Sequence, residues 1–223
     1  MPAHLAEPDG RGPRPAVLVL MEAFGLVPSI ESVATRLAGE GYLALAPDLY
    51  YRDGPDATAS YGDLPRAMQL MHALVERGDA YASDVAAAID FLEARSDVVH
   101  GRVGVVGFCM GGALTFGSAC ALPERIAAAA PFYGGGIVRL LPRAARIACP
   151  LLFFFGERDP LIPIDQVREI EARLRDLGKE FRIETYPGAD HGFMNEARAA
   201  TYHPQAAGDA WKKLLHFFAA HLG

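Results

Sequence analysis

The chain of 223 residues has 27 acidic and 21 basic side chains, a formal net charge of −6, and 51% hydrophobic residues. A chain of this length buries a sizeable core without metal or disulfide support, and α/β folds of this size are commonly undivided. The charge is mild and forms no basic block, so the composition excludes nucleic acid as an expected partner. Three cysteines whose spacing matches no zinc or CxxC pattern indicate free thiols in a reducing compartment.

We expect one domain over residues 1–223, with residues 1–14 flexible or loosely attached. That N-terminal segment lacks the charged-then-apolar layout of a secretory signal. The apolar run at 16–20 is too short to span a bilayer. The sequence therefore predicts a cytoplasmic protein without membrane contact, present as a monomer or a small homo-oligomer, that needs no cofactor and no metal ion.

Short apolar runs alternate with helical patterns, which predicts βαβ units around a mostly parallel sheet flanked by helices on both faces. Several runs are continuous in Val, Leu and Phe, as expected of strands that are covered on both faces. In chain order, the predicted strands span residues 16–21, 42–46, 103–108, 127–132, 151–155 and 181–186. The predicted helices span residues 30–40, 64–77, 81–94, 110–121, 164–177 and 209–221.

The strand predicted at 103–108 runs into the segment GFCMG, which is the nucleophile-elbow pattern G-x-S-x-G with Cys109 in place of the serine. The glycines leave room for a sharp strand-to-helix turn, whose middle residue adopts a strained backbone conformation. The helix N-terminus that follows favours a thiolate and a developing oxyanion. Cys109 could also be a small buried hydrophobic residue, but the whole pattern at this junction favours a nucleophile. Cys120 and Cys149 are predicted to be structural.

An elbow nucleophile needs a general base, and the base needs a carboxylate that orients it. The strand at 151–155 leads into the acidic residues Glu157 and Asp159, and the strand at 181–186 leads into His191. We expect both segments to emerge at the same sheet edge as the elbow. The order nucleophile, acid, histidine is the one that accompanies such an elbow.

Asp159 is the preferred acid, because it stands two residues farther beyond the strand than Glu157 and could reach across to an imidazole N–H. Asp190 directly precedes His191 and is better suited to accept a hydrogen bond within a local turn. His191 could itself be a surface histidine in a turn, and His203 is a weaker alternative as the base.

Glu22 ends the first predicted strand, where a buried charge is costly unless it faces a polar site. It could cap a helix or pair with an arginine; alternatively, it contacts the nucleophile pocket. In the second interpretation, the backbone N–H groups of Ala23 and Met110 form an oxyanion hole for the tetrahedral intermediate of acyl transfer. The residues alone leave both interpretations open.

Aromatic residues flank the predicted site. Phe24, Tyr133 and Phe193 are candidates for an apolar wall that binds substrate, although each is also an ordinary core residue.

Four motifs, in this order, resemble the dienelactone hydrolase family of α/β-hydrolases. They are MEAFG at 21–25, GFCMGG at 107–112, GERDPLIP at 156–163 and GADHGF at 188–193. The resemblance covers essentially the whole chain, residues 15–222, and implies the α/β-hydrolase fold.

The same resemblance implies a catalytic triad of Cys109, His191 and Asp159. It also implies that Glu22 contacts the resting thiol and helps to generate the thiolate when substrate binds. These roles are expectations carried over from the family.

One departure from the family concerns substrate binding. Its best-known members bind a substrate carboxylate with arginines, one of which lies a few residues after the catalytic histidine. In this chain Asn195 stands at that position, and Arg66 is a candidate for the second arginine. The resemblance therefore supports the hydrolase chemistry more firmly than a carboxylate on the substrate.

The sequence thus predicts a cysteine-dependent hydrolase that cleaves ester or enol-lactone bonds in a small molecule. Two alternatives use the same fold: a non-catalytic binding protein in which Cys109 senses oxidation, and an acyl transferase with an acceptor other than water. The lack of a second cysteine placed as a resolving partner argues against the redox alternative.

Overall fold

The computed structural model describes residues 1–10, 12–55 and 57–223. Within these ranges, seven strands form one sheet in the order β1-β3-β2-β4-β5-β6-β7. All neighbouring pairs are parallel except β1 with β3, which confirms the predicted mostly parallel sheet. The strands are β1 (Ala3–Ala6), β2 (Arg14–Leu20), β3 (Leu43–Pro47), β4 (Val98–Phe108), β5 (Ala128–Phe132), β6 (Leu151–Gly156) and β7 (Phe181–Tyr186).

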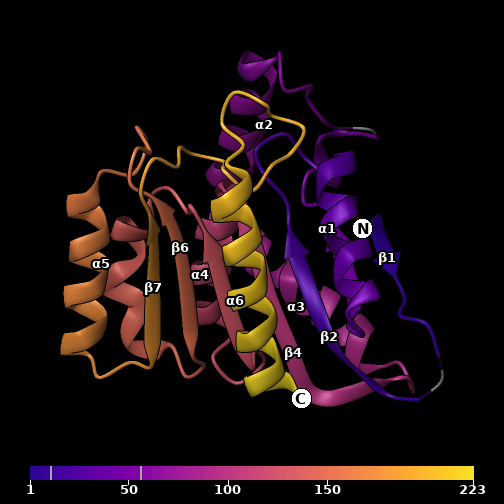
Figure 1. Cartoon of the computed structure of the whole chain (residues 1–223). Helices are drawn as coiled ribbons and strands as arrows, with labels where there is room; N and C mark the ends of the chain where they lie inside the picture. The colour runs from indigo at the N-terminus through magenta and orange to yellow at the C-terminus, as the bar shows by residue number, and fades with distance from the viewer. Residues whose placement is uncertain (11, 56) are drawn as a thin grey trace.

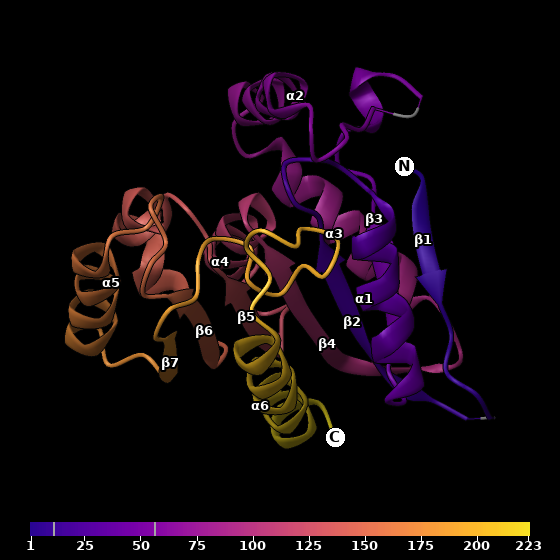
Figure 2. The ribbon, with the colours of Figure 1, turned by 45° about the horizontal axis from the view of Figure 1, so that its top comes forward.

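Helices cover both faces of this sheet. Helices α1 and α6 lie on one face, and α3 and α4 lie on the other (Figures 1 and 2). The α-helices are α1 (Pro28–Gly39), α2 (Leu64–Glu76), α3 (Ala80–Glu93), α4 (Met110–Ala121), α5 (Ile164–Asp176) and α6 (Pro204–Leu222). Two 3₁₀ segments, η1 (Tyr51–Asp53) and η2 (Ile137–Arg146), join strands to the elements that follow.

The carboxyl ends of the parallel strands point toward one edge of the sheet, at the top of Figure 1. Helix α2 and the long loop between β7 and α6 lie at this same edge. Strands β3, β5 and β6 are buried along their whole length, as the continuous apolar runs predict. The layered core therefore brings the loops that follow β2, β4, β6 and β7 together on one side.

All six predicted strands and all six predicted helices are present, most with closely matching bounds. Helix α6 begins at Pro204 rather than at 209, because Pro204 occupies the first helical turn and His203 Nδ1 accepts the Ala206 N–H at 3.3 Å. Strand β4 begins five residues earlier than predicted, at Val98 rather than 103.

The N-terminal segment differs from the expectation that residues 1–14 are loosely attached. Residues Ala3–Ala6 form the antiparallel edge strand β1, which pairs with β3. The Asp48 N–H extends this pairing by donating to the Pro2 carbonyl at 2.9 Å. A strand of four residues carries too little periodicity to be recognised in a sequence, and only the open edge of β3 defines it.

None of the helices in the described ranges combines the length and the apolar character needed to span a bilayer.

Candidate active site

The elbow lies where β4 ends at Phe108 and α4 begins at Met110. Cys109, between them, has φ 55° and ψ −116°, a left-handed conformation that a residue with a side chain rarely adopts. Its N–H donates to the Phe132 carbonyl of β5 at 3.1 Å, which ties the turn to the sheet. The predicted strained turn is therefore present, and it leaves the thiol partly exposed at the N-terminus of α4.

The glycines of the elbow are required by close backbone contacts. A Cβ at Gly107 would lie under 3.0 Å from the Gly111 carbonyl, and one at Gly111 would lie under 3.0 Å from the Leu20 carbonyl at the end of β2. A Cβ at Gly112 would likewise lie under 3.0 Å from the Phe132 carbonyl. Because these neighbours are backbone atoms, they cannot rotate away. The elbow is thus wedged between β2 and β5.

Gly111→Ala is expected to lower the free energy of unfolding by about 3 kcal/mol, since the new methyl group must displace the end of β2. Urea unfolding followed by circular dichroism measures this change. The matched control is Gly208→Ala, in the exposed part of α6, where nothing lies within 4 Å of the added Cβ. That variant should be about 0.5–1 kcal/mol more stable. Equal stability of the two variants would contradict the close fit of the elbow.

The predicted base and acid are in direct contact. His191 Nδ1 lies 2.7 Å from Asp159 Oδ2, in a buried pair that joins the loops after β6 and β7. The other carboxylate oxygen, Asp159 Oδ1, accepts the N–H groups of Leu161 at 2.8 Å and Ile162 at 3.2 Å. The carboxylate is therefore held from both sides, and it orients the imidazole.

The other candidates have different partners. Glu157 accepts a hydrogen bond from Thr185 Oγ1 at 3.1 Å, and His203 caps α6. Asp159 is thus the candidate acid that binds His191.

The pKa of His191 is raised to about 10. Burial opposes protonation of the imidazole, but the hydrogen bond to Asp159 and the nearby Cys109 thiol outweigh burial. His191 Nε2 is buried and has no hydrogen-bond partner among the described residues. The Cys109 side chain nevertheless lies close enough to raise the pKa of the His191 ring. This nitrogen is therefore free to exchange a proton with a bound substrate.

Glu22 is 2% exposed at the end of β2, and a hydrogen-bonded clamp holds it. The Tyr61 hydroxyl and Asn195 Nδ2 both donate to Glu22 Oε2 at 3.0 Å. Asn195 Nδ2 also lies 2.7 Å from the Tyr61 oxygen, which in turn bonds Ser29 Oγ on α1. The network thus joins the chain after β2 to the loop before α2, the loop after β7 and the start of α1, and it holds Glu22 in place.

Burial raises the pKa of Glu22, while Tyr61, Arg198, His191 and Asn195 oppose that shift. A carboxyl group with a raised pKa in a polar site is typical of a proton-transfer residue.

Two backbone donors complete the elbow. Among the described residues, no backbone carbonyl accepts the N–H of Ala23 or the N–H of Met110, the first residue of α4. Ala23 directly follows Glu22, and the end of β2 packs against Gly111. Both N–H groups can therefore serve an oxyanion on a substrate bound at Cys109.

A cavity of about 270 Å³ opens beside Glu22. Its lining includes Phe108 at the end of β4, Tyr133 after β5 and Asn195 in the loop after β7, together with residues of α1 from Pro28 to Arg36. Most of its surface is apolar, and its polar lining residues include Glu22, Arg36 and Asn195. The shape and lining suit a small, mostly apolar organic molecule.

A model of the dienelactone hydrolase family matches residues 1–222. The chain belongs to this family. The "Putative carboxymethylenebutenolidase" of Synechocystis sp. is 36% identical, over 98% of this chain and 91% of that protein. The crystal structure of a putative dienelactone hydrolase from Klebsiella pneumoniae has a TM-score of 0.85 and 33% identity, covering 98% of this chain and 92% of that one. The crystal structure of the dienelactone hydrolase-like promiscuous phosphotriesterase P91, from metagenomic libraries, has a TM-score of 0.82 and 27% identity, and the match covers 96% of this chain and 89% of that one.

The chain is therefore a member of a hydrolase family with the α/β-hydrolase fold that the motifs predict. Within this dienelactone hydrolase fold, Tyr133 follows β5 with a positive φ of 36°, and its ring lies 5.2 Å from that of His191. Phe193 packs behind Tyr133, with ring centroids 5.4 Å apart. Phe24 packs on Tyr61 at 4.7 Å. These three predicted wall residues thus surround the site, although only Tyr133 lines the cavity.

Arg66 lies away from the cavity, because its guanidinium turns along α2 to Gln69 Oε1 at 3.1 Å. Two other arginines lie near the site. Arg36 lines the cavity. The Arg198 guanidinium lies 5.7 Å from the Phe24 ring centre, and its charge acts on Glu22. The sequence signal for Arg198 was its place three residues after Asn195. Tyr61, a further site residue not predicted, had no signal beyond lying on the long loop before α2.

No group of three or more His, Cys, Asp or Glu side chains suited to hold a metal ion occurs in the part of the chain that the structure describes.

Proposed function

We propose that this hydrolase cleaves ester or enol-lactone bonds through an acyl-cysteine intermediate on Cys109. The observation that carries the proposal is the buried His191–Asp159 pair at 2.7 Å, beside a partly exposed cysteine in a strained strand–helix turn. A nucleophile, a base and an orienting acid in this relation are the parts that acyl transfer requires.

In the first half-reaction, the Cys109 thiolate attacks the carbonyl carbon, and the carbonyl oxygen becomes an oxyanion bound by the N–H groups of Ala23 and Met110. The C–O bond to the leaving group then breaks, and protonated His191 donates its proton to the departing oxygen. The raised pKa of His191 supports its role as the proton donor.

In the second half-reaction, neutral His191 takes a proton from water, and the resulting hydroxide attacks the thioester. The C–S bond breaks, which releases the acid and restores the thiolate. A thiolate is itself a good leaving group, so substrates whose leaving oxygen is stabilised suit this site better than amides. An enol-lactone has such an oxygen.

Glu22 is proposed to help form the thiolate. Its raised pKa and its position beside the elbow, where its charge acts on His191, support a role as the acceptor of the thiol proton. Tyr61 and Asn195 both donate to one carboxylate oxygen of Glu22, and among the described residues no hydrogen bond occupies the other oxygen.

A substrate panel tests the proposal. Enol-lactones with and without a carboxylate and 4-nitrophenyl esters should be hydrolysed with kcat/KM at least about 100-fold above that for a 4-nitroanilide. A nitrophenyl phosphotriester extends the panel, because the similar P91 structure is described as that of a promiscuous phosphotriesterase. Added alcohols reveal an acyl transferase if they divert most of the product to a new ester.

Alkylation with iodoacetamide gives the control. Burial raises the pKa of Cys120 to about 11 and that of Cys149 to about 12, so neither thiol reacts readily at neutral pH. One alkylated residue, Cys109, should therefore account for complete loss of hydrolysis. Alkylation of Cys109 in a protein that hydrolyses no compound of the panel would instead support a thiol-sensing binding protein.

A further inference from the structure

Tyr50 lies between β3 and η1, immediately before the first residue of η1. It contacts both residues of the proposed oxyanion hole. Its side chain is fully buried, with 0% of its surface exposed. The Tyr50 hydroxyl donates to the Ala23 carbonyl at 3.1 Å and lies 3.3 Å from Met110 Sδ. One hydroxyl group therefore lies between the loop after β2 and the first residue of α4.

Hydrogen bonds fix the peptide groups on both sides of Ala23. The Glu22 carbonyl accepts the Gly25 N–H at 3.0 Å, and the Ala23 carbonyl accepts the Tyr50 hydroxyl. In a trans peptide the N–H points opposite to the preceding carbonyl, so the first bond sets the direction of the Ala23 N–H. Ala23 lies beyond the last residue of β2, where no strand ladder holds it. The Tyr50 bond fixes the next peptide group, so the two bonds together hold the backbone of Ala23 on both sides of its Cα.

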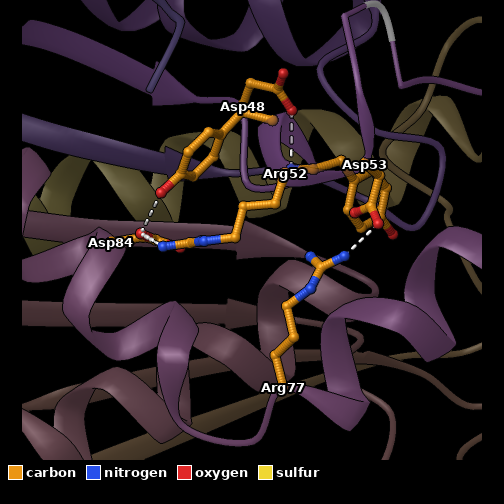
Figure 3. A network of polar contacts seen from close by, with 7 residues as sticks. Asp48, Arg52, Asp53, Arg77 and Asp84 are labelled. Atoms are coloured by element: carbon orange, nitrogen blue, oxygen red, sulfur yellow. Dashed lines mark hydrogen bonds and ion pairs between the residues drawn. The ribbon is translucent and has the colours of Figure 1, made fainter.

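Residues close to Tyr50 in the chain form two ion pairs, Arg52 with Asp84 and Asp53 with Arg77 (Figure 3). The Tyr50 N–H donates at 2.9 Å to Oδ1 of Asp48, the residue that follows β3. Arg52 binds Asp84 of α3 with both terminal guanidinium nitrogens, Nη1 and Nη2, the latter at 2.8 Å. Asp84 is only 7% exposed.

The second ion pair of Figure 3 joins Asp53 to Arg77 after α2, and the Tyr51 hydroxyl adds a bond to Asp84 at 3.2 Å. Three successive residues after Tyr50 are thus anchored to α2 and α3. Because a paired, nearly buried carboxylate is costly to disrupt, this anchor keeps the Tyr50 ring in one position.

We propose that Tyr50 is a positioning residue that sets the geometry of the oxyanion hole by bonding the Ala23 carbonyl and contacting Met110. The proposal rests on the proposed function, since it needs an oxyanion at Ala23 and Met110. Tyr50 touches no reacting atom in this scheme; it acts through the backbone of Ala23. Burial, followed by the nearby Cys109, raises the pKa of Tyr50 above its ordinary value, so the hydroxyl remains a donor at neutral pH.

Tyr50→Phe removes the hydroxyl alone and keeps the buried ring. We expect kcat for a 4-nitrophenyl ester to fall by about 10-fold with KM within about two-fold, because the hole acts on the transition state. A trifluoromethyl ketone forms a C–S bond to Cys109 and places an oxyanion in the hole, so its affinity should fall by the same factor. Iodoacetamide alkylation of Cys109 forms no oxyanion, and its rate should be unchanged.

Tyr186→Phe is the matched control, because it removes another buried tyrosine hydroxyl with one hydrogen bond, to Asp209 Oδ2 at 2.9 Å. This variant should keep the wild-type kcat and ketone affinity. For Tyr50→Phe, an unchanged kcat, or a parallel loss of hydrolysis and alkylation, would overturn the positioning role. Failure of the proposed function shows separately, as absence of hydrolysis by the wild-type protein or full activity without Cys109.

Discussion

Cys109→Ala is expected to lower kcat for an activated ester by about 10⁴-fold or more, because the elbow then lacks the atom that forms the acyl intermediate. The backbone donors at Ala23 and Met110 remain, so a small activity above the uncatalysed rate is expected to persist. A continuous 4-nitrophenyl ester assay measures the loss, and intact-protein mass spectrometry should show that the acylated species has disappeared.

Cys149→Ala is the matched control for removal of a thiol. Cys149 is 6% exposed and precedes β6, away from the elbow, so this variant should retain the wild-type kcat. The kcat of Cys109→Ser should lie between those of Cys109→Ala and Cys149→Ala. A hydroxyl group ionises far less readily than a thiol and depends on His191 for proton removal. Substantial ester hydrolysis by Cys109→Ala would contradict the acyl-cysteine mechanism.

Asp159→Asn is expected to lower kcat by about 10³–10⁴-fold, because it changes the tautomer of His191. Two backbone N–H groups donate to Asp159 Oδ1, so in the variant the amide oxygen must take that position. The amide NH₂ group then faces His191 Nδ1, which has to become an acceptor. The ring proton moves to Nε2, and the imidazole can no longer accept a proton there.

The same substitution should lower the pKa of His191 from about 10, since the Asp159 bond is what opposes burial most strongly. Titration of the His191 ring protons by NMR measures this change. A folded-state pKa above the ordinary 6.5 stabilises the fold fully below pH 6.5, and the contribution is lost as pH rises to about 10. Asp159→Asn should therefore weaken this pH dependence of the unfolding free energy.

Glu157→Gln is the control for Asp159→Asn, because Glu157 lies two residues away and bonds Thr185 instead of His191. Its kcat should stay within about two-fold of the wild type. If Glu157→Gln were the variant that lost activity, the assignment of the acid to Asp159 would be wrong.

Local patterns in the sequence were enough to predict most of the helices and strands and the elbow at Cys109. The strained turn at Cys109 requires glycines within a few residues, and the buried strands require continuous apolar runs. Both features therefore produce patterns in short stretches of sequence. The edge strand Ala3–Ala6 was missed because its four residues are defined by pairing with β3.

The sequence alone determined the fold class, the nucleophile candidate and the histidine, because periodicity and turn geometry act between near neighbours in the chain. Only the tertiary structure decided which carboxylate meets His191 and which side chains hold Glu22. Asn195 bonds Glu22 from 173 residues away, and Arg198 rather than Arg66 approaches it. Such contacts depend on the order of strands in the sheet and on the paths of long loops. They are set by packing among distant segments, for which a single sequence has no local pattern.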